Sequence, residues 1–361
     1  MFPLGVNAVT PFPDRTMSLE KVVIVGASGY SGEELVRLLS RHPHAEMVAL
    51  TSRQLAGQML ASVYPRFAAT RYAGLKFIGS TTEAILATGA RIVFLALPHG
   101  VAAEYAAPLV KAGLKVLDLS ADFRIKNLAT YEEFYGEKHH APELAAISVY
   151  GLPEIYREQI RAAQLVACPG CYPTSILLPL IPLLRRRLVK PQSICVFSMS
   201  GVSGAGRNAK TDYLFAECNE SVRAYSVPKH RHLAEIEQEL SIAAGSSVVI
   251  NFTPHLVPVN RGIHTTIYAA PEDGIEAWHI ANAWNEEYGS AKFVRLLGEN
   301  ELPDTKNVTG TNFVDIAMRH DARTGRFVLL SAEDNLVKGA AGQAVQCLNI
   351  LCGWPEETAL L

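Results

Sequence analysis

The first half of the chain alternates between short apolar runs and stretches in which apolar residues recur at helical spacing. The runs are Lys21–Val25, Met47–Leu50, Arg91–Leu97 and Lys115–Ser120. Runs of this length suit strands that are buried on both faces of a parallel sheet. After the first run, Leu35, Leu38 and Leu39 fall on one side of a helix predicted over Glu33–Leu39. Strands that alternate with helices in this way predict a doubly wound α/β domain.

Beyond residue 170 the elements are predicted to follow a different plan. The expected strands are Ser193–Ser200, Val248–Thr253, Ile263–Tyr268 and Phe327–Ser331. We predict that they form an open antiparallel sheet with helices on one face, and that Pro254–Pro258 connects the second and third strands. The tail Asn335–Leu351 is predicted to be a long alanine-rich helix that begins at the cap pair Asp334 and Asn335.

The length of 361 residues favours two domains. We predict a Rossmann dinucleotide-binding domain over residues 18–167, to which the C-terminal helix at 334–361 returns. Residues 168–333 are predicted to form an α+β catalytic and oligomerisation domain. Residues 1–17 are expected to be a disordered leader, because they contain several prolines and lack the basic start and apolar centre of a signal peptide. Met17 remains an alternative start.

Composition restricts the possible partners and location. The net charge is −2 and no lysine/arginine run occurs, so no nucleic-acid partner is expected. The longest apolar stretch, Ile176–Leu184, contains two prolines and is too short to cross a bilayer, so no membrane partner is expected either. Six cysteines in a chain of this size favour a cytoplasmic location over a disulfide scaffold. No histidine/cysteine cluster has zinc-ligand spacing, so no metal is predicted.

A glycine-rich turn follows the first predicted strand and precedes the first predicted helix. Glycines allow the backbone to approach a pyrophosphate, and the helix N-terminus supplies N–H donors. The spacing is G-x-x-G-x-x-G, not the commoner G-x-G-x-x-G, so the strand–loop–helix context strengthens the prediction. The residues predicted to bind the cofactor here are Gly26, Ser28, Gly29, Tyr30, Ser31 and Gly32.

The end of the second strand indicates which dinucleotide is bound. An NAD site usually has an acidic residue there to hold the ribose 2′-hydroxyl. This chain has Ser52 and Arg53 instead, which suit a 2′-phosphate, so NADP(H) is predicted over NAD. Pro98, His99 and Gly204 complete the predicted cofactor site, although His99 fits the alternative role of a loop cap equally well.

Cys171 lies in a Pro-Gly turn directly before a predicted helix. A thiol at this position faces unpaired N–H groups and the positive end of the helix dipole, which favour the thiolate and can hold an oxyanion. A nucleophilic cysteine combined with a nucleotide fold indicates acyl-thioester chemistry coupled to hydride transfer. The alternative is that Cys171 is one more buried small hydrophobe.

Two further features are candidates for binding an anionic substrate. Arg124, which follows a predicted strand, offers a fixed fork of donors for a substrate anion. The loop Gly201–Arg207 contains small residues and an arginine, so either it cradles a phosphate through Ser203 and Arg207 or it merely connects two elements.

These motifs together resemble those of the N-acetyl-gamma-glutamyl-phosphate reductases, a family in the wider group of aspartate-semialdehyde and glyceraldehyde-3-phosphate dehydrogenases. The resemblance covers about Lys21 to Trp354. Besides the glycine turn, it rests on Asp118–Arg124, Tyr150–Glu154, Pro169–Thr174 and Ser200–Arg207.

The resemblance carries expectations about fold, activity and assembly. It implies a Rossmann domain joined to a second domain of the glyceraldehyde-3-phosphate dehydrogenase type. It also implies NADPH-dependent reduction of a small acyl phosphate, N-acetyl-gamma-glutamyl phosphate, to N-acetylglutamate 5-semialdehyde in arginine biosynthesis, with Cys171 as the nucleophile. A homodimer or homotetramer that meets through the second domain is the implied assembly.

A cysteine that acts near neutral pH needs an imidazole to take its proton and then to protonate the thiohemiacetal oxygen. We predict His232 for this role, at the entrance of a short helix, and assign His230 to the substrate. His255 and His264 are the rival histidines.

Two departures from the family pattern leave alternatives open. Cys168 stands where the family usually has asparagine, which creates a C-x-x-C spacing with Cys171 that either forms a reversible disulfide or fills a buried slot. Ala234 stands where the family commonly has proline. The alternative functions are an aminoadipyl-phosphate reductase that acts on a carrier protein in lysine biosynthesis, and a non-catalytic redox-sensing NADP-binding regulator.

Overall fold

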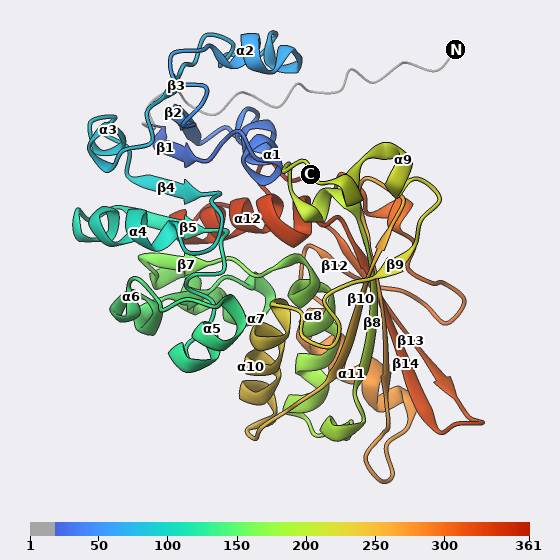
Figure 1. The fold of residues 1–361 in the computed structure, drawn as a ribbon. Helices are drawn as coiled ribbons and strands as arrows, with labels where there is room; N and C mark the ends of the chain where they lie inside the picture. Colours follow the sequence, from blue (N-terminus) through green and yellow to red (C-terminus); the bar gives the residue numbers. More distant parts are fainter. Residues whose placement is uncertain (1–18) are drawn as a thin grey trace, which may run out of the picture.

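The first half of the chain forms a parallel sheet, seen at the upper left of Figure 1. The structure, a computed structural model, describes residues 19–361, so the leader predicted at 1–17 lies outside the described residues. The strand order is β3-β2-β1-β4-β5-β7-β6, and all neighbouring strands are parallel. The strands are β1 Glu20–Val25, β2 Ala45–Thr51, β3 Phe77–Ile78, β4 Ile92–Leu95, β5 Lys115–Asp118, β6 Val149–Tyr150 and β7 Leu165–Ala167. The predicted doubly wound sheet is confirmed.

Helices cover both faces of this sheet, which explains why its central strands are apolar throughout. One face packs against α1 (Tyr30–Leu39), α7 (Pro153–Ala162) and α12 (Gly342–Cys352). The other face packs against α3 (Thr82–Leu86), α4 (Ala102–Lys111) and α6 (Pro142–Ile147). The short helices α2 (Leu60–Val63) and α5 (Leu128–Tyr135) lie in the connections. Helix α12 comes from the far end of the chain and joins the core of the first sheet, as Figure 1 shows.

The second half forms a seven-stranded sheet of order β12-β13-β14-β11-β8-β10-β9, on the right of Figure 1. Its strands are β8 Cys195–Gly201, β9 Arg223–Ala224, β10 Asn251–Val257, β11 Ile263–Ala269, β12 Val294–Leu296, β13 Val314–Asp321 and β14 Arg326–Glu333. Helices α8 (Cys171–Arg185), α10 (His232–Ala244) and α11 (Ala277–Tyr288) share one apolar core with it. The short α9 is Phe215–Cys218. The α+β second domain with helices on one face is therefore confirmed.

The expectation of a wholly antiparallel second sheet is wrong. Strands β8 and β10 are parallel, and so are β12 and β13. The reason is that α10 lies between β8 and β10 in the chain and returns it to the same end of the sheet, as a crossover connection does. Strands β10 and β11 are also not neighbours, because β8 lies between them.

The connection expected over Pro254–Pro258 belongs largely to strand β10, which ends at Val257. Proline is tolerated at position 254 because the sheet requires no N–H donor from the backbone at that position. The Pro254 carbonyl accepts from Tyr225 N–H at 3.2 Å, so the backbone polar groups of Pro254 face the edge strand β9. That strand pairs only with His255 and Leu256. An edge-facing position is where a strand accommodates proline.

Helix α8 continues through Pro179 and Pro182 because the second sheet and α11 satisfy the carbonyls that these prolines leave free. Ser331 Oγ on β14 donates to the Ser175 carbonyl at 2.6 Å, four residues before Pro179. Tyr288 Oη on α11 donates to the Leu178 carbonyl at 2.7 Å, four residues before Pro182.

In residues 19–361, no helix is both long enough and apolar enough to cross a membrane.

The tail does not form one continuous α-helix from Asn335. Asp334 does cap the segment, since its carboxylate accepts from Leu336 N–H at 2.7 Å and from Val337 N–H at 3.1 Å. The first turn, Val337–Ala341, is π-helical, and α12 begins only at Gly342. Single π-helical turns often mark functional sites. This one is buried beside the start of α8, where Gly339 packs against Cys171.

Candidate active site

The glycine turn has the shape that a dinucleotide requires. Gly26 has φ +82°, and a Cβ on it would lie 2.4 Å from the Ala96 carbonyl oxygen. A Cβ on Gly32 would lie 2.4 Å from the Gly26 carbonyl oxygen, so both positions require glycine. A Cβ on Gly29, the N-cap of α1, would meet nothing closer than 3.7 Å. The turn therefore leaves open space over the N-terminus of α1, where Tyr30 and Ser31 begin the helix, and fits a pyrophosphate.

The other residues predicted to bind the cofactor follow neighbouring strands at the same sheet edge. Ser52 is buried, and its Oγ lies 3.3 Å from Ser28 Oγ in the glycine turn. Arg53 is exposed beside it. Pro98 and His99 are exposed after β4, which pairs with β1. Four of the predicted positions thus lie where ligands collect in doubly wound folds.

Cys171 is the first residue of α8, and Gly170 is its N-cap. The Gly170 N–H donates to Glu235 Oε1 at 2.9 Å. A Cβ on Gly170 would lie 2.6 Å from His232 Nε2 and 3.0 Å from Arg124 Nη1. The turn that carries Cys171 is therefore packed directly against the His232 ring, and only glycine leaves room for this contact.

Glu235 links the cysteine turn to Arg124 and Tyr150 of the first domain. Its buried carboxylate accepts from Gly170 N–H, from Tyr150 Oη at 2.6 Å and from Arg124 Nη1 at 3.2 Å. Glu235 lies one helical turn after His232 on α10, so the same helix holds the ring and anchors the turn. This arrangement fixes His232 relative to the residue before Cys171.

The electrostatics of Cys171 differ from the expectation that the helix N-terminus favours a thiolate. Burial raises the pKa of the Cys171 thiol to about 12, and Glu333, in its ionised form, contributes to that shift. The Tyr172 N–H and the charges of Arg124 and Arg231 lower that pKa, but by less. In the free protein the thiol form is therefore favoured, because desolvation outweighs the helix terminus.

His232 and His230 are both held as neutral imidazoles. Burial lowers the pKa of His232 well below its usual range, reinforced by the neighbouring His230 ring and by the charges of Arg124 and Arg231. Burial and Arg231 lower the pKa of His230 to about 4. The His230 Nδ1 accepts from the His232 N–H at 3.1 Å. A neutral imidazole can accept a proton, as a base beside a thiol must.

The rival histidines lie on the other face of the second sheet. His264 is flanked on β11 by the inward residues Ile263 and Thr265, and Thr265 Oγ1 lies 2.8 Å from Ser175 Oγ of α8. His255 on β10 packs on Phe197, with ring centroids 4.3 Å apart. Side chains alternate between faces along a strand, so His255 and His264 point away from the helix that carries Cys171.

The residues predicted to bind the substrate anion are engaged elsewhere. Arg124 is buried, and its guanidinium donates to the carbonyls of Cys168 and Leu119 at 2.8 Å each and to Glu235. These contacts do not favour direct binding of a substrate by Arg124, because its donors are already used by the cysteine turn.

Arg207 and Ser203 also make contacts that the sequence did not indicate. Arg207 ion-pairs with Glu33 of α1 and lies over the Tyr30 ring at 4.7 Å. It therefore contacts the glycine turn of the first domain. Ser203 Oγ accepts from Asn335 Nδ2 at 3.0 Å. A Cβ on Gly204, in the same loop, would lie 3.0 Å from Ser200 Oγ.

Several residues at the site were missed by the sequence reasoning. They are Glu235, Tyr150, Arg231 and Glu333. Arg231, between the two histidines, is exposed and has no ion pair within residues 19–361. Glu235 had a usable signal, since it falls one helical turn after His232. Glu333 had none, because a glutamate at the end of a strand gives no indication of the helix it faces.

The C-x-x-C cysteines are not partners in this structure. Cys168 and Cys171 are both free. Cys168 is fully buried and interacts with Cys347 of α12, whose Sγ lies 3.4 Å from the Gly151 carbonyl oxygen. Cys168 therefore fills a buried slot here.

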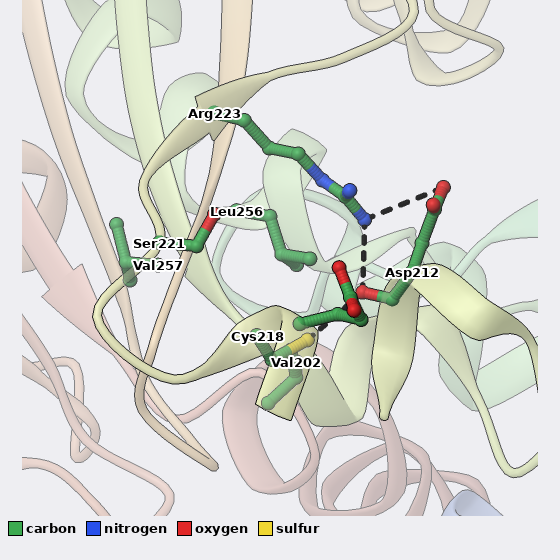
Figure 2. A pocket seen from close by; sticks show the side chains of 8 residues that line it. Val202, Asp212, Cys218, Ser221, Arg223, Leu256 and Val257 are labelled. Carbon is green, nitrogen blue, oxygen red and sulfur yellow. Dashed lines mark hydrogen bonds and ion pairs between the residues drawn. The ribbon is translucent and has the colours of Figure 1, made fainter. Parts of the chain in front are cut away.

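A narrow cavity, open to solvent, lies apart from these residues, between the end of β10 and the segment 212–223. Figure 2 shows Arg223 directed at Asp212, to whose side chain and carbonyl it bonds at 3.5 and 3.1 Å. Glu217 adds a second acid to the lining. Because the positive charge of Arg223 is already paired with Asp212, this cavity is not suited to an anionic substrate.

Comparison with known sequences identifies the class of protein that this fold and site define. The family described as "Semialdehyde dehydrogenase, NAD binding domain" matches residues 21–163, and "Semialdehyde dehydrogenase, dimerisation domain" matches residues 171–335. The chain thus combines the two domains of a semialdehyde dehydrogenase, which are the two sheets described above.

Close relatives narrow this class to one family. The N-acetyl-gamma-glutamyl-phosphate reductase of Akkermansia muciniphila is 57% identical over 95% of this chain and 99% of its own length. That of Moorella thermoacetica is 50% identical over 94% of this chain and 97% of its own. The chain belongs to the N-acetyl-gamma-glutamyl-phosphate reductase family and is an oxidoreductase of arginine biosynthesis, as the sequence predicted.

Solved structures show the same fold at low identity. Aspartate semialdehyde dehydrogenase II of Vibrio cholerae has a TM-score of 0.70 at 20% identity and covers 93% of this chain and 99% of its own. The aspartate semialdehyde dehydrogenase of Candida albicans, solved with NADP, has a TM-score of 0.69 at 17% identity over 93% and 99%.

Proposed function

We propose that this chain reduces N-acetyl-gamma-glutamyl phosphate through a thioacyl intermediate on Cys171. Cys171 Sγ attacks the acyl carbon, the bond from that carbon to the phosphate oxygen breaks, and inorganic phosphate leaves and takes up one proton from solvent. The reducing step uses the hydride that NADPH supplies when bound. The observation that supports this mechanism best is the packing of the His232 ring against Gly170, directly before Cys171.

His232 is the proposed acid and base. As a neutral imidazole it takes the proton of the Cys171 thiol, and the ion pair that forms costs less than an isolated buried thiolate. The imidazolium then lends its proton to the thiohemiacetal oxygen. When the C–S bond breaks, the aldehyde leaves and the proton returns to His232. The N–H groups of Cys171 and Tyr172, at the first positions of α8, are oriented to hold the oxyanion.

Arg231 is the proposed partner of the substrate's anionic groups. The acyl phosphate and the α-carboxylate both need cationic donors. Arg124 pairs with Glu235, Arg207 with Glu33 and Lys338 with Glu154 at 2.6 Å, so their charges are already neutralised. Arg231 adjoins both histidines and is exposed. We retain His230 as a proposed substrate contact and Ser203 as a proposed phosphate contact in the loop Gly201–Arg207.

The cofactor is NADP(H) rather than NAD(H). The Candida albicans neighbour was solved with NADP, and Ser52 and Arg53 follow β2 with Arg53 exposed for a 2′-phosphate. The open space over Gly29 fits the pyrophosphate. Pro98 and His99 would lie along the nicotinamide half, since β4 adjoins β1. Gly204 remains a candidate contact from the second domain.

A homodimer, or a homotetramer built from it, is the proposed assembly. The family model for residues 171–335 is named for dimerisation. The sheet face opposite α8 carries exposed aromatic side chains, with Phe197 36% and Tyr268 43% exposed. Covering such a face with a second copy would bury them. We propose two domains, the first formed by residues 18–167 together with 334–361 and the second by residues 168–333. We also propose a cytoplasmic location, where free cysteines persist.

The reverse reaction tests the proposal directly. The purified protein should reduce NADP in the presence of both N-acetylglutamate 5-semialdehyde and inorganic phosphate, measured as absorbance at ~340 nm. Aspartate semialdehyde and the one-carbon-longer aminoadipate analogue are the matched controls and should react far more slowly. NADP reduction that does not depend on phosphate would contradict the acyl-phosphate mechanism.

A further inference from the structure

Glu333 is a buried carboxyl group that the mechanism above does not use. It is the last residue of β14 and has zero exposure. Neither of its side-chain oxygens has a hydrogen-bond partner within the described residues. A buried polar group without a partner costs on the order of 1–3 kcal/mol, so its presence requires an explanation.

The packing of β14 on α8 brings Glu333 to the nucleophile. Ser331 on β14 bonds the Ser175 carbonyl of α8. Glu333 lies on the same face two residues further along the strand, and Cys171 lies one helical turn before Ser175. Both side chains lie against Gly339 of the π-helical turn. A Cβ on Gly339 would lie 2.8 Å from Cys171 Cβ and 3.0 Å from Glu333 Oε1.

The charges around Glu333 favour its neutral form. The facing groups are Lys338 on the π-helical turn, Glu154 on α7, the adjacent Asp334 and the Cys171 thiol. Lys338 is fully buried and already paired with Glu154 at 2.6 Å. An ionised Glu333 would add an uncompensated negative charge to this interior. Burial accordingly raises the pKa of Glu333 well above its usual range, with Lys338 opposing and Asp334 and Glu154 reinforcing the shift.

We propose that Glu333 acts as a neutral carboxylic acid that donates its O–H to the Cys171 sulfur once the thiol has lost its proton. This inference rests on the proposed function only in taking Cys171 as the nucleophile. The hydrogen bond leaves every proton count unchanged, since the thiol proton still goes to His232. It stabilises the thiolate where the helix terminus alone does not outweigh burial. The neutral acid also avoids the repulsion that a carboxylate would exert on the thiolate.

The test is the rate at which iodoacetamide alkylates Cys171, mapped by mass spectrometry between pH 6 and 10. This assay reads thiolate reactivity without turnover, so it remains informative if the substrate assignment fails. In Glu333→Leu, which lacks a donor, alkylation near pH 7.5 should be about ten- to a hundredfold slower. In Glu333→Gln, whose amide N–H is a weaker donor, the loss should be about three- to tenfold.

The shape of the pH profile gives a second readout. The wild-type profile should show a second inflection as Glu333 ionises and opposes the thiolate, and Glu333→Gln should lack it. Glu239→Gln is the matched control. Glu239, on α10, is also buried, but unlike Glu333 its carboxylate has a partner, since it accepts from Tyr156 Oη at 2.5 Å. It should leave the Cys171 profile unchanged.

Three outcomes would overturn the proposal. One is a Glu333→Leu protein that binds NADPH normally and alkylates at the wild-type rate, which would mean that Glu333 only fills space. Another is Glu333→Gln alkylating as slowly as Glu333→Leu, which would mean that an ionisable base is required. The third is a Glu333→Gln pH profile that keeps the second inflection of the wild type, which would mean that the inflection does not come from Glu333. This outcome can be measured even if Glu333→Leu does not fold.

Discussion

The glycine turn at Gly26–Gly32 and the cysteine turn at Cys168–Thr174 share one local design but are completed differently. Each joins a parallel strand, β1 or β7, to the N-terminus of a helix, α1 or α8. The glycine turn is constrained by nearby backbone, such as the contact of Gly32 with the Gly26 carbonyl. The cysteine turn is constrained by side chains more than 40 residues away in sequence, Arg124 and Glu235.

This difference reflects the chemistry of each site. Holding an anion requires N–H groups and space, which a strand–turn–helix segment provides alone. Activating a thiol requires a base, a donor and controlled burial, which have to come from other elements. In this protein the proposed base, His232, comes from α10 and the proposed donor, Glu333, comes from β14. We therefore expect substitutions at the cysteine turn to affect chemistry and those at the glycine turn to affect binding.

The largest effect should come from Cys171→Ser. Turnover should fall by several orders of magnitude, because the hydroxyl is a far weaker nucleophile than the thiolate. NADPH affinity, measured by fluorescence titration, should stay nearly the same, since the glycine turn is intact. Cys168→Ser is the matched control and should remain active. Residual activity above about a tenth in Cys171→Ser would contradict the thioacyl mechanism.

His232→Asn should be the next most severe change. Without the acid and base, turnover should fall roughly a hundred- to ten-thousandfold. Alkylation of Cys171 near neutral pH should slow as well, because the thiolate loses its imidazolium partner. His230→Asn should affect alkylation less. A folded His232→Asn protein with wild-type alkylation and near-normal turnover would show that His232 has only a structural role.

A pair of glycine substitutions separates the two turns directly. Gly170→Ala places a methyl group 2.6 Å from His232 Nε2 and should displace the ring, lowering kcat about ten- to a hundredfold. Gly29→Ala meets nothing closer than 3.7 Å in the protein. It should fold normally but weaken NADPH binding by narrowing the phosphate space. Equal effects of both changes on kcat and cofactor affinity would break the contrast between binding and chemistry.

Arg53→Ala sharpens the assignment of the cofactor site. A charge-assisted contact to a phosphate is worth roughly 1.5–3 kcal/mol, or about ten- to a hundredfold in affinity. NADPH affinity should fall by that factor, while NADH affinity should barely change. Calorimetric titration with both cofactors makes the comparison, and an equal loss for both would remove Arg53 from the 2′-phosphate site.

The smallest effect concerns stability and pH. Burial lowers the pKa values of His42 and His230 to about 4, from an unfolded value of about 6.5. Between pH 4 and 6.5 the unfolded chain binds more protons, so the free energy of unfolding should fall as the pH drops through this window. Each ring should contribute about 1–3 kcal/mol. His230→Asn should flatten part of the slope in thermal melts, and an unchanged slope would contradict the shift.

Much of the fold followed from sequence because its signals are local. The buried strands of the first sheet are apolar runs, and the turn after β1 contains glycines at the positions that structure requires. Strand pairing in the second sheet did not follow, since the parallel alignment of β8 and β10 depends on where α10 returns the chain. The position of Pro254 within β10 was missed for the same reason, because only the neighbouring strand decides whether its missing N–H is costly.

For the site, the sequence by itself was sufficient to predict the candidate residues that lie in short recognisable motifs. These were the glycine turn, Cys171 at a helix start and the His230–His232 stretch. The family and reaction class were predicted correctly from the glycine turn together with the motifs at 118–124, 150–154, 169–174 and 200–207. Only the tertiary structure decided what those groups contact. Burial, not the helix terminus, controls the Cys171 pKa, and Arg124 and Arg207 serve protein contacts. Desolvation and long-range pairing depend on what surrounds a side chain, which β14 and α10 supply from distant parts of the chain.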